Sequence, residues 1–152
     1  MVREEGERLE MEETARRTPG VSLKDVFLRA ATGLSGDDRR AEVVAEALDF
    51  LQRGFDSHYA TAGATDEDVL VGDNAYAQAV ETIARLDEPR FVAVASRMIR
   101  DGAGRIAAGE GVTLTLWTPH LAGLLDIISG EGQDESETRI REAAEKAGSR
   151  DG

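Results

Sequence analysis

The 152-residue chain lacks cysteine altogether, and only 5% of its residues are aromatic. Without cysteine there is no disulfide bond, thiolate metal ligand or cysteine nucleophile. The sequence also has no run of about 18 apolar residues, which excludes a transmembrane helix and so an integral membrane association. Its first residues are acidic and lack the apolar region of a secretory signal, and we therefore expect a cytoplasmic protein.

Positive charge is scarce as well. Thirty acidic residues stand against 18 lysines and arginines, and the formal net charge is −12. Because binding to nucleic acid or to an anionic membrane needs clustered cations, we expect neither partner. An acidic surface that is poor in lysine is typical of proteins adapted to high salt, where ions screen the self-repulsion. A halophilic source is therefore our hypothesis.

The spacing of apolar residues is helical almost throughout. It predicts a short helix capped by Ser22, then helices over 38–59, 66–86 and 89–108, one from Thr118 to Ile128, and a last one over 138–147. The alternation over 112–117 resembles a short strand, but no second strand is available to pair with it. The sequence therefore predicts an all-α, antiparallel helical bundle.

The ends of the chain differ from the rest. Residues 1–20 are charged on all sides, and we expect a frayed helix or a solvated arm there. We assign residues 21–148 to one all-α domain and residues 149–152 to a disordered tail.

The pair Gly72-Asp73 is the most informative local feature. It lies in an otherwise apolar helical pattern, where a glycine costs about 1 kcal/mol relative to alanine. A carboxylate that points inward from such a helix needs a hydrogen-bond donor, a cation or a metal. The pair therefore requires a structural or a functional explanation.

A short loop between the helices over 38–59 and 66–86 makes these helices antiparallel. Asp56, His58 and Asp73 should then lie toward a common end of the bundle. Carboxylates on facing helices are how all-α proteins hold a divalent metal or a diphosphate–Mg²⁺ cluster. The alternative is that His58 is a core histidine and Asp73 is a buried hydrogen-bond acceptor.

At this point the residues resemble a family. The segments over 71–73, 76–79, 83–86 and 106–111 are similar to the central region of the trans-isoprenyl diphosphate synthases. The order of Gly54-Phe55-Asp56-Ser57-His58 and Val71-Gly72-Asp73 is most similar to the non-catalytic small subunit of heptaprenyl diphosphate synthases, which carries "GLDTH" ahead of "AGD". The resemblance covers 43–111 and extends weakly to 141–148. It implies a shortened isoprenoid-synthase-like fold.

Catalytic members of that family hold Mg²⁺ and diphosphate on two DDxxD motifs. Here Asp56 stands alone at the first of these places, and no second motif follows. Ionising an allylic diphosphate requires concentrated positive charge on the leaving group. The resemblance therefore implies a homologue without independent prenyl transfer, and we assign no catalytic residue and no metal ligand.

Our leading interpretation is a non-catalytic subunit in polyprenyl diphosphate synthesis, whose partner is a catalytic prenyl synthase subunit or a second copy. Asp56, His58 and Asp73 would lie at the mouth of a cavity. Its lining would come from Phe55, Gly72, Tyr76, Val80 and Ile83. One alternative is an active prenyltransferase in which Asp56 and Asp73 coordinate Mg²⁺. Another is an acidic helical interaction protein of a halophile with no isoprenoid role.

Overall fold

A computed structural model of the protein describes residues 21–34, 38–60 and 66–150. These residues form six helices and no strand: α2 (Leu23–Ala31), α3 (Asp38–Ala60), α4 (Asp66–Ala84), α5 (Pro89–Ala107), α6 (Leu114–Ser129) and α7 (Gln133–Arg150). The predicted all-α class is thereby confirmed. The charged arm expected over 1–20 lies outside the described residues. Residues 149 and 150, which we assigned to a tail, belong to α7.

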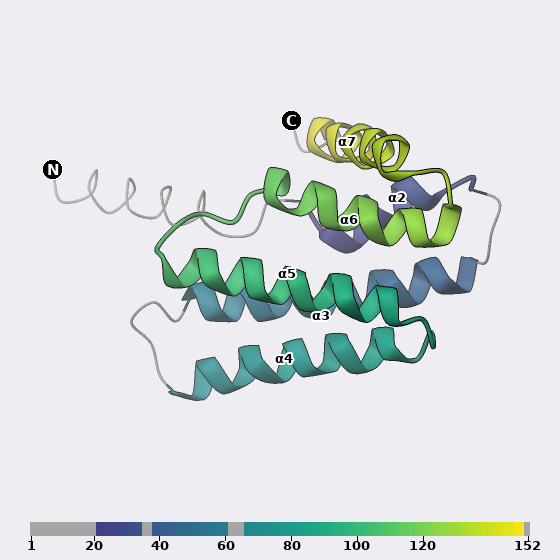
Figure 1. Ribbon diagram of the computed structural model, residues 1–152. Coiled ribbons are helices and arrows are strands. Elements are labelled where there is room, and N and C mark those ends of the chain that lie inside the picture. Colours follow the sequence, from purple (N-terminus) through teal and green to yellow (C-terminus); the bar gives the residue numbers. More distant parts are fainter. Residues whose placement is uncertain (1–20, 35–37, 61–65, 151–152) are drawn as a thin grey trace, which may run out of the picture.

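Successive helices from α3 to α6 run antiparallel to one another (Figure 1). The helix α4 forms one side of the molecule and packs on α3 and α5 alone among the described elements. On the other side, α2 lies against α3, α6 and α7. No helix in the described ranges is both long enough and apolar enough to cross a membrane.

The helices begin where local chemistry supplies a cap. The Ser22 side chain accepts a hydrogen bond from the backbone N–H of Asp25, as the sequence predicts for α2. Asp87 adopts a left-handed conformation with φ of 55° and separates α4 from α5, and Pro89 opens the first turn of α5. Proline suits that position because the first turn has no intrahelical partner for its N–H.

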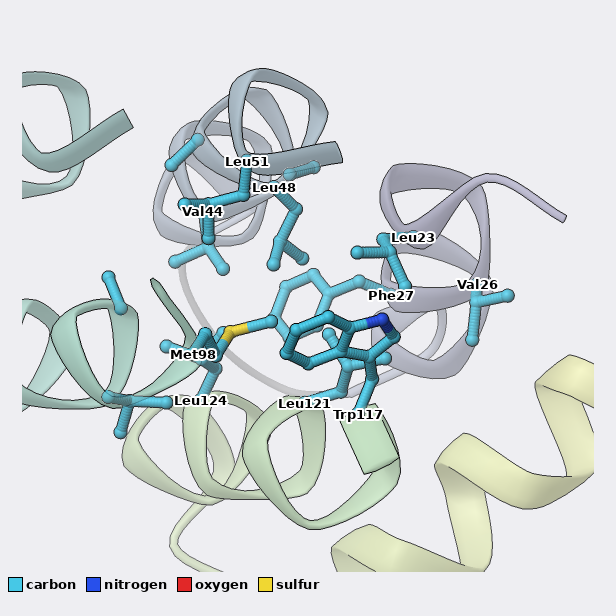
Figure 2. Close-up of a cluster of buried hydrophobic side chains, with 14 of the residues drawn as sticks. Leu23, Val26, Phe27, Val44, Leu48, Leu51, Met98, Trp117, Leu121 and Leu124 are labelled. Atoms are coloured by element: carbon cyan, nitrogen blue, oxygen red, sulfur yellow. The ribbon is translucent and has the colours of Figure 1, made fainter. Parts of the chain in front are cut away.

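All six helices contribute buried apolar side chains to the core, and Figure 2 shows the part of it where α2, α3, α5 and α6 meet. Along α3 the apolar stripe of Val44, Leu48, Leu51 and Phe55 is buried, with each side chain no more than 1% exposed. Trp117 of α6 is fully buried with them. At about 1.5–3 kcal/mol for each large apolar side chain, this burial is the main stabilising contribution to the fold.

Two helix starts differ from the prediction. We expected Thr118 to cap a helix, but α6 begins at Leu114, with Thr113 as its cap, and Pro119 lies inside the helix. The alternating residues over 112–117 therefore include the first turn of a helix. The last helix, α7, begins at Gln133 and not at Thr138, and Ser136 in its first turns is buried.

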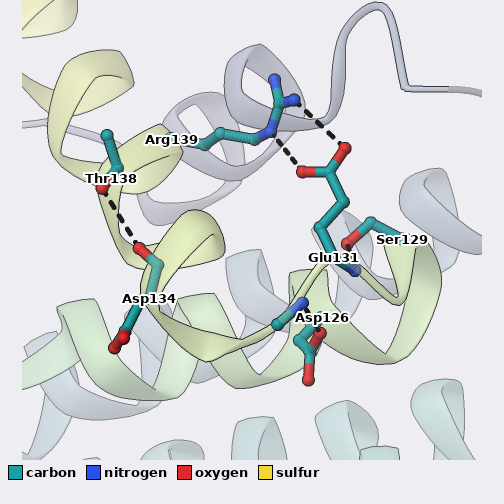
Figure 3. A network of polar contacts seen from close by, with 7 residues as sticks. Asp126, Ser129, Glu131, Asp134, Thr138 and Arg139 are labelled. Carbon is teal, nitrogen blue, oxygen red and sulfur yellow. Dashed lines mark hydrogen bonds and ion pairs between the residues drawn. The ribbon is translucent and has the colours of Figure 1, made fainter.

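The turn between α6 and α7 is tied by polar contacts (Figure 3). Gly130 ends α6 in the left-handed conformation with φ of 70°, which glycine adopts without steric cost. The N–H of Gly132 donates to Asp126 Oδ1 at 2.7 Å. Arg139 of α7 donates twice to Glu131, at 2.8 and 3.1 Å, and so fixes the turn on the start of α7.

Candidate functional site

His58 of α3 and Asp73 of α4 meet across the two helices. The distance from His58 Nε2 to Asp73 Oδ1 is 3.0 Å, an ion pair when the imidazole is protonated. The histidine side chain is 20% exposed and the aspartate side chain 59% exposed. Asp73 is therefore not the inward carboxylate that the sequence pattern suggested, since it lies at the surface and reaches back over α3.

Asp56 does not belong to this face of α3. Gly54 and His58, four residues apart, both lie against α4. Residues two apart on a helix point roughly 200° away from each other. Asp56 accordingly lies on the exposed side of α3. Asp56 and Asp73 thus do not fit a shared Mg²⁺ site in this arrangement.

The two glycines Gly54 and Gly72 bring the backbones of α3 and α4 together. A Cβ added at Gly54 would lie 3.2 Å from the carbonyl oxygen of Gly72, and one added at Gly72 would lie 3.3 Å from that of Gly54. Each added Cβ would also overlap a ring, that of Tyr76 at position 54 and that of His58 at position 72. The glycine of the Gly72-Asp73 pair is therefore explained by close helix packing.

Five rings follow one another across the bundle, and we call them the ring row: His58, Tyr76, Phe55, Trp117 and His120. Neighbouring ring centroids are 4.9, 5.3, 4.7 and 6.2 Å apart in that order. Aromatic pairs at such distances add about 0.5–1.5 kcal/mol beyond their buried area. The row joins α4, α3 and α6.

The far end of the ring row repeats the arrangement of its near end. His120 of α6 places Nε2 2.9 Å from Asp101 Oδ2 of α5. A third glycine, Gly102, lies beneath the rings, since an added Cβ would be 2.7 Å from Trp117 Cη2 and 2.8 Å from Phe55 Cζ. Gly102 therefore lets α5 pack closely against α3 and α6. At Gly104 no neighbouring atom lies within 4 Å of the position of an added Cβ.

Sequence reasoning did not find the pair of His120 and Asp101. Trp117 and His120 are three residues apart, which places them on one face of a helix. The predicted helix start at Thr118 leaves Trp117 outside the helix and so hides this signal.

Tyr76 is the polar member in the middle of α4's buried face. It is 8% exposed, and none of the described residues offers its hydroxyl a hydrogen bond. Burial, and secondarily the nearby Asp73 carboxylate, raise the pKa of Tyr76 well above its usual value. The phenol therefore stays neutral across the physiological range.

The residues proposed to line a cavity are largely packed in the core. Phe55, Tyr76 and Ile83 are buried, and Val80 is half-buried. Surface pockets between described residues occur elsewhere, and two of them are as follows. One, of about 570 Å³, lies between α6 and α7, and the other, of about 620 Å³, lies beside the end of α5. None of the proposed lining residues borders either pocket.

Within the described ranges, no three His, Asp or Glu side chains are grouped so that they could hold a metal ion. Comparison of the chain with known protein families, with curated proteins and with solved structures finds no match.

Proposed function

We propose that this chain is a non-catalytic helical subunit that acts beside a catalytic isoprenyl diphosphate synthase. The observation that carries the proposal is the contact of His58 with Gly72 and Asp73. In the family that the sequence resembles, a Gly-Asp pair at the head of a helix approaches the cavity for the diphosphate. In this chain the same pair is engaged by a side chain of the neighbouring helix.

The surrounding residues support this role. The space above Gly54 is taken by Tyr76 and the space above Gly102 by Phe55 and Trp117. Gly54, Gly72 and Gly102 are thus each matched by a ring of a neighbouring helix. Side chains packed in this way hold α3, α4 and α6 at fixed distances, which suits a subunit that presents a rigid surface to a partner.

An acidic helical interaction protein without an isoprenoid role is the second candidate. The 59% exposure of the Asp73 side chain favours it, because an exposed carboxylate is not one that borders a cavity. The two candidates differ in the partner, and the same experiment separates them.

The test is reconstitution with a catalytic isoprenyl diphosphate synthase from the same cell. The chain alone, given allylic and homoallylic diphosphates with Mg²⁺, should form no product. Mixed with the synthase, it should co-elute in size-exclusion chromatography and change the length distribution of the prenyl products. Robust product formation by the isolated chain would overturn the proposal. A chain that neither co-elutes nor changes the products would leave the second candidate.

A further inference from the structure

The exposed face of α4 carries an apolar patch. Leu70 is 66% exposed and Val71 55% exposed, and they are the large apolar side chains that stand out as exposed in the described part of the chain. The opposite face of α4 is buried through Gly72, Ala75, Tyr76, Ala79 and Ile83. Since α4 packs only on α3 and α5, no described element covers Leu70 and Val71.

All charged residues of this helix are acidic. It contains Asp66, Glu67, Asp68, Asp73 and Glu81 and no lysine, arginine or histidine. Glu67, Asp73 and Glu81 are exposed on it. The charged side chains that α4 itself carries around Leu70 and Val71 are therefore all acidic, and this selects among the surfaces that could cover the patch.

We infer that this face of α4 binds an amphipathic helix of a partner whose apolar side chains are flanked by lysine or arginine. Apolar side chains of the partner would cover Leu70 and Val71, as in helices that dock on an apolar surface. Cationic side chains would reach Glu67 and Glu81, and their alkyl stems would extend the apolar contact.

Charge argues against a second copy as the occupant. A symmetric pairing through α4 would place the same acidic residues of two chains against each other. Each chain carries a net charge of −12, and like charges that face each other at an interface oppose association. A basic partner gains from the same field that repels a second copy.

This inference deepens the proposed function by naming a surface and the chemistry of its partner, but its test does not depend on any synthase. The probe is a synthetic helix of leucine and lysine with its leucines on one face, and titration calorimetry with the full chain measures its affinity. A matched helix of leucine and glutamate serves as the second probe. The first peptide should bind and the second should not.

Two pairs of variants locate the site. Leu70→Asn with Val71→Thr leaves the charge unchanged and should weaken binding about tenfold, a loss that corresponds to about 1.4 kcal/mol. Glu67→Gln with Glu81→Gln on α4 should weaken binding more than Glu135→Gln with Glu142→Gln on α7. Both charge variants remove two exposed carboxylates, so they have the same net charge.

Equal losses from the α4 and α7 charge variants would mean that the peptide responds to net charge alone, and this would overturn the inference. So would a concentration-dependent dimer of the chain that the change at Leu70 and Val71 abolishes, because the occupant would then be a second copy. Binding at α4 without any effect on a synthase would uphold the surface and count against the isoprenoid role.

Discussion

The ring of His58 lies over Gly72 so closely that no side chain at position 72 could share the space. The contact joins α3 to α4, and it places the histidine 3.0 Å from Asp73. A glycine that looks costly within one helix is thus required by the helix beside it.

Replacing Gly72 with alanine should therefore destabilise the protein, by about 1–3 kcal/mol, because the added methyl group displaces the His58 ring or separates the helices. Gly104→Ala is the matched control. That glycine also lies within a helix, but no neighbouring atom lies within 4 Å of the position of an added Cβ. The control should stabilise the protein by up to about 1 kcal/mol, from helix propensity alone. Urea unfolding measures both. Two changes of the same sign would contradict the packing described for Gly72.

Phe55 should be among the most sensitive positions of the core. It is fully buried, it stacks on Trp117 with ring centroids 4.7 Å apart, and it also contacts Tyr76. Phe55→Ala should cost about 3–5 kcal/mol in unfolding free energy. Phe50→Ala, on the same helix but only half-buried, should cost less. Fluorescence of Trp117, the single tryptophan, follows both transitions. Similar costs at the two positions would show that Phe55 has no special place in the ring row.

The Tyr76 hydroxyl should contribute nothing to stability near neutral pH, because no described residue pairs with it. Tyr76→Phe should leave the unfolding free energy unchanged or raise it slightly, since a buried group without a hydrogen bond is removed. A clear loss of stability in this variant would indicate a hydrogen bond to the hydroxyl.

The same residue should make the protein sensitive to alkali. Burial and Asp73 hold the folded-state pKa of Tyr76 above the unfolded value of about 10. Above that pH the unfolded chain has lost the phenolic proton while the folded chain retains it, so stability falls as the pH rises. Unfolding measured from neutral to alkaline pH should show a steeper decline for the natural chain than for Tyr76→Phe. Parallel declines would contradict the assigned shift.

Stability should rise with salt if the acidic surface is an adaptation to it. The Debye length falls from about 10 Å at 0.1 M to about 3 Å at 1 M, so KCl screens the repulsion within a chain of net charge −12. Glu135→Gln with Glu142→Gln should stabilise the protein at low salt and reduce its response to KCl. Unfolding midpoints that do not change with KCl would exclude a halophilic adaptation.

The helices could be predicted from the sequence where apolar residues recur at steps of three and four. This rule accounts for the buried stripe of α3, which consists of Val44, Leu48, Leu51 and Phe55. The cap of α2 was predictable because the Ser22 hydroxyl can accept a hydrogen bond from a backbone N–H of the first turn. The start of α6 could not be predicted in this way. A proline is typical of the first helical position, so Pro119 predicts a helix start there, yet α6 begins at Leu114. The burial of Trp117 and Thr118 outweighs the one backbone hydrogen bond that the proline removes.

The site was predicted in part. Antiparallel packing of α3 on α4 correctly implied that His58 and Asp73 lie near each other. It did not fix the direction of the side chains. Asp73 follows Gly72 by one residue, a rotation of about 100°, which takes it from the buried face to the surface. The pair of His120 and Asp101 joins two helices through tertiary packing that no local pattern encodes.

The glycines beneath the ring row also restrict the order in which this sequence can change. At position 72 an alanine becomes acceptable only after the His58 ring has been replaced by a smaller side chain, and the same holds for Gly54 with Tyr76. If the ring residue is replaced first by a smaller side chain, a void remains. If the glycine is replaced first by a larger residue, the new side chain overlaps the ring. Divergent descendants of this chain should therefore exchange each glycine and its ring as a couple, so that the two positions covary.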